Sequence, residues 1–382
     1  MAEADLSDTA MEINFPEDIW IEILVRVPAE YLVKFTKVSK SWYSLITSSR
    51  FISNHLARIK IRRPKSILTR YYSVTEKQEH YTLHPDNDDF VLQSSEIELP
   101  RRSRSDYYTI VGSCNGLICL CDAEHGTTNP IFVWNPSIRR WIELPIPNIE
   151  PYSRDITLGF GCDLQQLDYK VVRNVLLSGN DGVWASEVYS LSSKRWRKVA
   201  IVPIRRHLVI SPSAPVLING IVHWKDCDEE SSLHHYLGFD LKDETFSEVF
   251  FPDDLATAHP GLLRELSYND CLAVLMTDEF RGFCNLWVMK EYGNVKSWEN
   301  LLKFKLVEGI ERVIGFRNNG HCLAPMTVDE LFLNDPSSKV LVSFDMHNSG
   351  AVKDLDIFGT HYSIYAEHFL ESLVLFEGQC RF

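Results

Sequence analysis

A turn signal that returns about every 50 residues constrains the fold of this chain more than any other feature. Asn-Gly or Asn-Asp pairs precede apolar stretches and begin at Asn115, Asn219, Asn269 and Asn319. The missing member of this series falls at Leu167-Asp168, which also precedes an apolar stretch. Asn-Gly is a strong hairpin signal because both turn positions tolerate positive φ. The series therefore predicts one hairpin in each repeat.

A second series has the same period. Each member is a strand-like stretch with a polar turn and then a large apolar residue, and these residues are Trp141, Trp196, Phe246, Trp298 and Val352. Two hairpins in every ~50 residues make a four-stranded sheet, which is the blade of a β-propeller at the length of kelch-type repeats. Five such blades fit between residues 106 and 357.

Strand-like stretches also remain at both ends of the repeat region, in residues 66–100 and 361–376. We expect them to combine into a sixth blade, because a closed ring leaves no unpaired strand edge. The predicted fold class is mainly β, with a small α-helical N-terminal domain followed by a kelch-like propeller of about six blades. A β-sandwich is the alternative, and the equal steps favour the propeller.

Residues 14–58 predict three short helices, at about Pro16 to Val27, Glu30 to Thr36 and Lys37 to Thr47. We expect Asn14 to cap the first helix and Pro28 to end it. The first helix is apolar over most of its circumference, so it must be buried on more than one side. A unit of ~40 residues cannot bury that much surface alone. Another protein, or the rest of the chain, must supply the missing contact.

The motifs of this helical segment resemble an F-box. They are FPEDI (15–19), ILVRVP (23–28), LVKF (32–35) and VSKSW (38–42). Phe15, Tyr31, Lys37 and Ser39 depart from the usual residues of that family. The alternative is an ordinary N-terminal helical hairpin that packs on its own domain.

Further motifs resemble the F-box-associated domain of plant F-box proteins, which is kelch-like. They are CNGLICL (114–120), WNPSIRRW (134–141), LGFGCD (158–163) and YKVV (169–172). The turn WNPS also has a structural explanation, because Pro presets φ after the strand that ends at Trp134. The expected domains are a disordered N-terminus (1–12), the F-box (13–59), a linker with the first strands of the closing blade (60–105) and the propeller (106–382).

The resemblance implies the substrate-recognition subunit of an SCF-type (cullin–RING) ubiquitin ligase. The F-box would bind the Skp-type adaptor, and through it a cullin, while the propeller captures a protein for ubiquitination and proteasomal degradation. The expected adaptor contacts are Pro16, Ile19, Ile23, Leu24, Val27, Pro28, Leu32, Val38 and Trp42. Trp42 either contacts the adaptor or packs between helices. A closed propeller has little need of extra helices for its core, which favours an external adaptor.

Substrate contacts are expected in loops on one face of the propeller, at residues 145–156, 178–184, 203–214, 225–235, 252–264 and 334–338. These loops have low hydrophobicity, which is typical of exposure. The pattern singles out no individual substrate-binding residue and no particular substrate.

Composition excludes several classes of protein. A net charge of −13 argues against nucleic-acid binding, which depends on phosphate neutralisation. No apolar run approaches the ~18 residues of a membrane span, and the N-terminus lacks the pattern of a secretory signal. We therefore expect a cytoplasmic or nuclear location, or both. Two basic clusters, at residues 58–65 and 101–104, are expected in a linker and a loop, with nuclear localisation or an acidic partner as the alternative.

No motif of catalysis, cofactor binding or metal binding is found in the sequence. The 9 cysteines lack framework or zinc spacing, so buried reduced thiols are expected, with Cys119 and Cys121 on one face of a strand. Phosphate-binding glycine motifs are absent, and the short Gly159-Phe160-Gly161 stretch is interpreted as a turn at the start of a strand. We predict that the chain is not an enzyme. The alternative is a propeller enzyme, or a module that binds a small ligand or glycan, with no role in ubiquitination.

Overall fold

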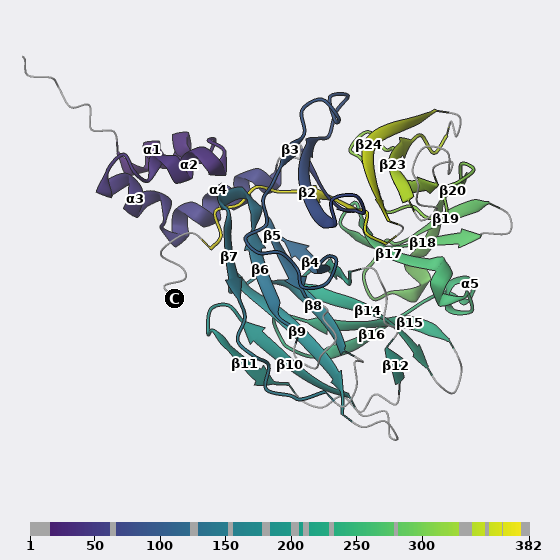
Figure 1. The fold of residues 1–382 in the computed structure, drawn as a ribbon. Helices are drawn as coiled ribbons and strands as arrows, with labels where there is room; N and C mark the ends of the chain where they lie inside the picture. Colours follow the sequence, from purple (N-terminus) through teal and green to yellow (C-terminus); the bar gives the residue numbers. More distant parts are fainter. Residues whose placement is uncertain are drawn as a thin grey trace, which may run out of the picture.

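The computed structural model describes residues 16–61, 66–122, 129–151, 156–177, 184–199, 206–208, 214–228, 233–278, 282–327, 338–347, 351–360 and 362–375. Helices occupy the N-terminal part of this chain and strands form nearly all of the rest (Figure 1). The predicted disordered N-terminus and the Asn14 cap lie outside the described residues.

The N-terminal unit consists of α1 (Glu17–Leu24), α2 (Ala29–Phe35), α3 (Lys40–Ile46) and α4 (Ser49–Ile61). Pro16 and Pro28 each occupy the position just before a helix, where the lack of an N–H costs nothing. The Ser39 hydroxyl accepts a hydrogen bond from the Trp42 amide and caps α3. The predicted first helix was too long at its C-terminal end, because the chain turns after Leu24, before it reaches Pro28.

The three predicted helices are present as α1, α2 and α3, and α4 is a fourth helix that was not predicted. Its buried residues Phe51, Ile52, His55 and Leu56 follow the spacing of one helical face. The first basic cluster therefore begins in a helix: Arg58 and Lys60 lie in the last turn of α4, where positive charge is favourable to the helix dipole. Residues 62–65 of that cluster lie outside the described part of the chain.

The described strands form six antiparallel sheets, which are the blades of a closed propeller. Blade 1 contains β4 (Thr109–Cys114), β5 (Leu117–Cys121), β6 (Ile131–Asn135) and β7 (Arg140–Glu143). Blade 2 contains β8 (Ile156–Asp163), β9 (Asp168–Leu176), β10 (Trp184–Ser190) and β11 (Arg195–Lys198). Blade 3 contains β12 (Arg206–Leu208), β13 (Val216–Ile218), β14 (Ile221–Asp228), β15 (His234–Asp240) and β16 (Phe246–Phe250).

The remaining blades complete the ring. Blade 4 contains β17 (Leu263–Tyr268), β18 (Cys271–Asp278), β19 (Phe283–Met289) and β20 (Trp298–Lys305). Blade 5 contains β21 (Gly315–Phe316), β22 (Cys322–Thr327), β23 (Ser338–Phe344) and β24 (Val352–Thr360). The closing blade contains β25 (Tyr365–Phe369), β1 (Ser66–Ser73), β2 (Gln78–Pro85) and β3 (Ser95–Glu96). Short helices α5 (Asp253–Ala256), η1 (Pro136–Ile138), η2 (Pro260–Leu262) and η3 (Val295–Ser297) lie between strands.

The predicted six-bladed propeller is confirmed, and both repeat series have a structural basis. Every turn of the first series joins the innermost strand of a blade to the next one. In blade 3 both β12 and β13 pair with β14, so they count together as the first strand and the turn joins β13 to β14. Asn115 and Gly116 have φ of 52° and 78°, and Asn269 and Asp270 have φ of 50° and 61°. The residues of the second series lie in the first two positions of the outermost strand: Trp141 in β7, Trp196 in β11, Phe246 in β16, Trp298 in β20 and Val352 in β24.

Two tryptophans of the second series also connect blades. The indole N–H of Trp196 donates to the carbonyl of Pro145, which lies between blades 1 and 2. The indole N–H of Trp298 donates to the carbonyl of Phe250 at the end of blade 3. Each of these tryptophans therefore lies in its own blade and donates a hydrogen bond to the chain at, or just after, the end of the preceding blade.

The interpretation of Gly159-Phe160-Gly161 as a turn was wrong, because these residues lie inside β8. A Cβ atom at Gly159 would lie 2.5 Å from the Trp224 ring, and one at Gly161 would lie 2.6 Å from Leu217. The two glycines therefore let blade 3 pack closely against blade 2. Cys119 and Cys121 of β5 are buried free thiols, as predicted.

The closing blade joins the two ends of the propeller. Residues Ser66 to Arg70 of β1 pair with Tyr365 to Phe369 of β25. Blade 5 is fixed to the closing blade by Arg317, whose Nε lies 2.8 Å from Oδ1 of Asp86. Burial alone would raise the pKa of Asp86, but hydrogen bonds from His368, the Asn318 amide and Arg317 lower this pKa to about 2. The carboxylate therefore stays charged at any ordinary pH.

After β25 the chain continues as residues 370–375, which we name the C-terminal strap. The strap runs from the closing blade to the helices (Figure 1). The side-chain amide of Asn135 donates to the carbonyls of Ser372 and Val374, at 3.0 and 2.7 Å. The Ser372 amide donates to the hydroxyl of Ser137. The WNPS turn of blade 1 thus holds the strap.

The helical unit packs on the strap and on blade 1. The Ala29 amide of α2 donates to the carboxylate of Glu371 at 2.9 Å, and α2 contacts η1. One hydrophobic cluster includes Leu24 and Leu32 from the helices, Leu117 and Val133 from blade 1, and Leu373 from the strap. The expectation that the propeller has little need of the helices was therefore wrong, since the two parts share a core.

We predict that Gly116→Ala destabilises the fold by placing a methyl group against the strap. The new Cβ would collide with the carbonyl oxygen of Leu370 and lie 2.6 Å from Cβ of Ser372. Gly320→Ala is the matched control, since Gly320 occupies the same turn of blade 5 with φ of 87° and open space around it. We expect about 1 kcal/mol of destabilisation for the control and about 2–4 kcal/mol for Gly116→Ala. Chemical denaturation of the full chain measures both, and equal losses would contradict this account of the strap.

We also predict that Asn135→Ala weakens the attachment of the helices. Asn135 is fully buried, and its replacement leaves two strap carbonyls without their donor. Such a loss costs about 2–4 kcal/mol, whereas a helix cap alone contributes about 1 kcal/mol. Asn294→Ala is the control, because Asn294 caps η3 as Asn135 caps η1 but contacts no strap. Hydrogen exchange of α2 should increase only in Asn135→Ala, and unchanged exchange there would refute the prediction.

Candidate functional site

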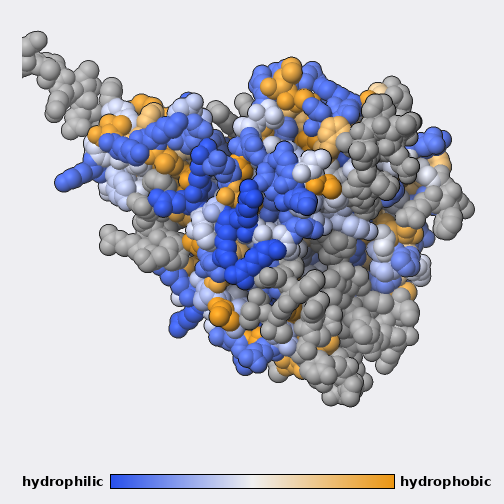
Figure 2. Space-filling model, in the orientation of Figure 1, coloured by the Kyte–Doolittle hydropathy of each residue, from blue (hydrophilic) through white to orange (hydrophobic). Residues whose placement is uncertain are grey.

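Apolar side chains remain exposed on the helical unit after it has packed on the propeller. The exposed fractions are 44% for Ile19, 47% for Ile23 and 64% for Val38, and that of Tyr31 is 48%. Pro16, Pro28 and Tyr43 are also exposed. We name these seven residues the helical apolar surface. Hydrophobic side chains are visible among hydrophilic ones on this unit (Figure 2).

The structure divides the nine predicted adaptor contacts into three groups. Pro16, Ile19, Ile23, Pro28 and Val38 belong to the helical apolar surface. Val27 and Trp42 are half-buried. Leu24 and Leu32, with exposed fractions of 2% and 0%, lie in the core shared with the propeller and present no side chain to a partner in this conformation.

The alternative roles of Trp42 are partly decided by its neighbours. Its ring centre lies 5.4 Å from that of Trp20 and 5.5 Å from that of Phe35. Trp42 therefore packs between helices and keeps only part of its ring accessible. Tyr31 and Tyr43 are exposed residues that the sequence did not single out, although their aromatic rings would suit an interface.

Charged pairs lie on the same helices as the helical apolar surface. Glu22 pairs with Arg26 at 3.4 Å and Glu30 with Lys34 at 3.0 Å, each one helical turn apart. All four side chains are mostly exposed, so these pairs contribute little to stability. Exposed apolar and charged side chains thus occur together on this unit, and protein–protein interfaces combine an apolar centre with a polar rim.

The propeller has two faces with different structures. Because strands are antiparallel, the turns after the first and third strands of each blade lie on one face, which we name the turn face. The connections after the second strand and between blades lie on the other, which we name the connection face. The strap contacts the turn face through Gly116 and Asn135, and α2 contacts it at η1. The helical unit is therefore docked on the turn face.

The described strand ends that flank all six loops predicted to contact substrate lie on the connection face. Loops 145–156, 203–214 and 252–264 join consecutive blades, and loops 178–184, 225–235 and 334–338 follow second strands. Residues 152–155, 178–183, 203–205, 209–213, 229–232 and 334–337 lie outside the described part of the chain. The role of these loops in binding stays a prediction.

Several of these ranges contain regular structure, contrary to expectation. Residues 225–228 continue strand β14, and the side chains of Lys225 and Asp226 are buried. Residues 206–208 form β12, and loop 252–264 contains α5 and η2. The charged residue Lys225 suggested that residues 225–235 begin an exposed loop. Lys225 is instead buried beside Glu265, with 3.1 Å between its Nζ and Oε2 of Glu265.

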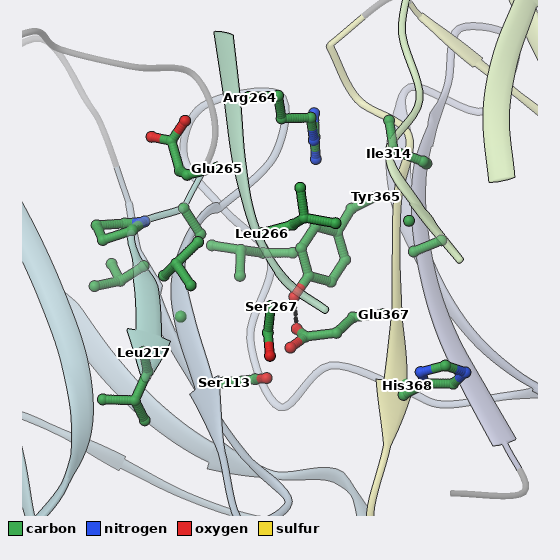
Figure 3. Close-up of a pocket in the computed structure, with 18 of the residues that line it drawn as sticks. Ser113, Leu217, Arg264, Glu265, Leu266, Ser267, Ile314, Tyr365, Glu367 and His368 are labelled. Atoms are coloured by element: carbon green, nitrogen blue, oxygen red, sulfur yellow. Dashed lines mark hydrogen bonds between the residues drawn. The ribbon is translucent and has the colours of Figure 1, made fainter. Parts of the chain in front are cut away.

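The innermost strands of the blades enclose a cavity of about 1320 Å³ at the centre of the ring. Its wall combines apolar residues such as Leu217, Leu266 and Ile314 with the small polar residues Ser113 and Ser267 (Figure 3). These side chains come from four different blades. The sequence could not reveal this set, because no two of the four strands are close in the chain.

The polar groups of the cavity differ between its two ends. Arg264 and Glu265 lie toward the connection face, and His368 lies toward the turn face (Figure 3). Between them, the Tyr365 hydroxyl donates to the carboxylate of Glu367. Burial, together with the charge of Glu367, raises the pKa of Tyr365, so the phenol keeps its proton. In the described wall, neither Ser113 nor Ser267 is hydrogen-bonded to a histidine or a carboxylate.

The described residues contain no group of three or more His, Cys, Asp or Glu side chains that could hold a metal ion. They also include no helix with the length and apolar character needed to cross a membrane.

Comparison with known proteins gave the same two parts. The F-box domain family matches residues 13–54, and the family described as F-box associated beta propeller domain matches residues 69–372. An F-box/kelch-repeat protein of Arabidopsis thaliana is 27% identical over 296 residues, which cover 76% of this chain and 79% of that protein. A second F-box protein of Arabidopsis thaliana is 25% identical over 375 residues, covering 90% and 87%.

Solved structures with a similar arrangement include TolB from Acinetobacter baumannii. It is 10% identical, with a TM-score of 0.44, and the match covers 84% of this chain and 72% of that one. A six-bladed lectin of Aleuria aurantia is 9% identical with a TM-score of 0.40, covering 78% and 96%. No functional argument rests on likeness at this level. The two family matches cover most of the chain, which therefore belongs to the F-box proteins that carry an F-box associated β-propeller domain.

Proposed function

We propose that this protein is the substrate-recognition subunit of an SCF-type ubiquitin ligase. Its helices bind a Skp-type adaptor, and through it a cullin, while its propeller captures a target protein for ubiquitination and proteasomal degradation. Membership of the F-box family supports the general role of substrate adaptor. The observation that carries the proposal is the helical apolar surface, which stays exposed although the helices are already packed on the propeller.

A stable monomer gains nothing from exposed isoleucines on a short helix. Ile19 and Ile23 lie one turn apart on α1, and Val38 follows α2. Burial of such side chains in an interface yields about 1.5–3 kcal/mol each when complete. Several large apolar side chains exposed on one small unit favour a docking site for another protein. We therefore expect the adaptor to bind the helical apolar surface.

The arrangement of the faces supports a division of labour within the chain. The helices occupy the turn face, and the predicted substrate loops belong to the connection face. One protein can therefore hold an adaptor and a target simultaneously without competition. Tethering raises the effective concentration of the target near the ubiquitin-charged enzyme, so the chain itself supplies position and no chemistry. We propose that this occurs in the cytoplasm, the nucleus or both.

We predict that Ile19→Asp combined with Ile23→Asp abolishes co-purification with the Skp-type adaptor. Two carboxylates in an apolar interface would remain unpaired, so binding should weaken at least a hundredfold. The fold should persist, because both side chains are substantially exposed. Leu24 and Val27 are poorer targets, because Leu24 belongs to the shared core and its substitution would destabilise the protein.

The matched control combines Leu92→Asp with Ile146→Asp. These side chains are 85% and 76% exposed, lie outside the helices, and add the same charge. The control should bind adaptor normally, and both double variants should unfold at the same temperature as the unmodified chain. If the Ile19 and Ile23 variant still co-purifies with adaptor, the proposed interface is wrong.

A further inference from the structure

The cavity opening on the connection face gathers three arginines from separate blades. Arg70 belongs to β1 of the closing blade, Arg264 to β17 of blade 4, and Arg312 to the connection between blades 4 and 5. All three line the central cavity. We name them the arginine mouth. These arginines are far apart in the sequence, which explains why they form no basic motif there.

Arg70 is buried without the hydrogen bonds that a guanidinium requires. Only 5% of the residue is exposed, and its Nε and Nη1 have no hydrogen-bond partner. Its guanidinium stacks on the ring of Tyr107, with 4.7 Å between its carbon and the ring centre. Stacking orients the group and leaves its N–H donors available in the plane. A buried charge that lacks hydrogen-bond partners costs folding free energy unless a ligand supplies those partners.

Arg312 also stacks on an aromatic ring. Its guanidinium carbon lies 5.1 Å from the ring centre of Tyr362, whose exposed fraction is 58%. Arg264 lies at the end of the cavity opposite His368 (Figure 3). Burial and the nearby charge of Arg312 lower the pKa of Arg264 to about 10. Burial lowers the pKa of Arg312 and the charge of Arg70 lowers it further, so Arg312 is close enough to repel both other arginines.

Each arginine of the mouth has a carboxylate near enough to act on its charge: Glu79 for Arg70, Glu265 for Arg264 and Glu311 for Arg312. Each of these carboxylates is shared with another group or is only partly ionised. Glu265 lies against the ammonium of Lys225, and Glu311 pairs with Lys339 at 2.9 Å. Glu79 accepts hydrogen bonds from the Tyr108 amide, and burial raises the pKa of its carboxyl group to about 7, so it is only partly ionised at neutral pH. The mouth therefore has an excess of positive charge in a chain whose net charge is −13.

We propose that the arginine mouth binds a phosphate or carboxylate group carried by an extended peptide segment of the captured protein. Guanidinium groups bind either anion through paired hydrogen bonds. The cavity behind the mouth, at about 1320 Å³, exceeds the ~300–1,000 Å³ of small-molecule pockets and has apolar walls from Leu217, Leu266 and Ile314. A peptide segment with an anionic residue followed by apolar residues would place its anion at the arginines and its apolar side chains against the cavity wall. This inference rests on the proposed role in target capture and names the chemistry of the target.

The first test is thermal unfolding of the full chain with inorganic phosphate, compared with sodium chloride at equal ionic strength. We expect phosphate to raise the unfolding temperature through the mouth. Arg70→Met and Arg264→Met should each weaken the phosphate constant about tenfold, which corresponds to about 1.4 kcal/mol. Without phosphate, each variant should be as stable as the unmodified chain or more so, because repulsion is removed. A purely structural arginine would instead lower stability in both buffers.

The control combines Arg101→Met with Arg102→Met. These arginines lie between β3 and β4 on the same face, outside the cavity lining, and are bound to Glu143 and Gln78. This control should respond to phosphate as the unmodified chain does. Loss of the response in the control, or its retention in Arg70→Met and Arg264→Met, would overturn the proposal.

The second test separates the two sources of anion. Fluorescent peptides that place phosphoserine, glutamate or serine before two leucines are titrated with the full chain. Binding of the phosphoserine or the glutamate peptide above the serine peptide, dependent on Arg264, supports the proposal and identifies its anion. Equal binding of all three refutes it. The adaptor experiment with Ile19 and Ile23 is independent, so failure of one proposal is distinguishable from failure of the other.

Discussion

The pairing of β1 with β25 is the interaction on which the whole molecule depends. It joins the beginning of the propeller to its end, so that every blade has a neighbour on both sides. The same pairing places the helices, which precede β1, beside the strap, which follows β25. Closure of the ring and docking of the helical unit are therefore consequences of a single set of backbone hydrogen bonds. The Arg317–Asp86 ion pair secures blade 5 against this seam.

The shared core gives the two functional surfaces a fixed relation. Leu24 and Leu32 pack with residues of blade 1 and of the strap, while the opposite side of the helices exposes Ile19 and Ile23. The arginine mouth lies on the other face of the ring. Because rigid packing spans the distance between these surfaces, an adaptor bound at one would hold a target bound at the other in a defined direction. A flexible linker in this position would offer no such control.

Local signals made the fold predictable, and the candidate site was less so. Asn115-Gly116 and Trp196 announce hairpins because their turn geometry and aromatic packing are properties of short sequences. The helix α4 was missed because its apolar face is interrupted by polar residues such as His55, which is nonetheless buried beside Val27. Leu24 looked like an interface residue because amphipathicity alone does not say which partner covers a face. Arg70 and Arg264 gave no signal, since only the closed ring brings them together.

The strap has a consequence for the order in which the protein acquires its structure. The helices are synthesised first, yet Leu373 and Glu371, which complete their packing, are among the last described residues of the chain. During synthesis, part of the apolar core of the helical unit therefore stays exposed until the propeller has formed and the strap can pack against the helices. A polypeptide that stops before β25 lacks both the seam of the ring and the support of its own helices. Translation through the strap is thus a physical condition for presenting the helices in their docked orientation.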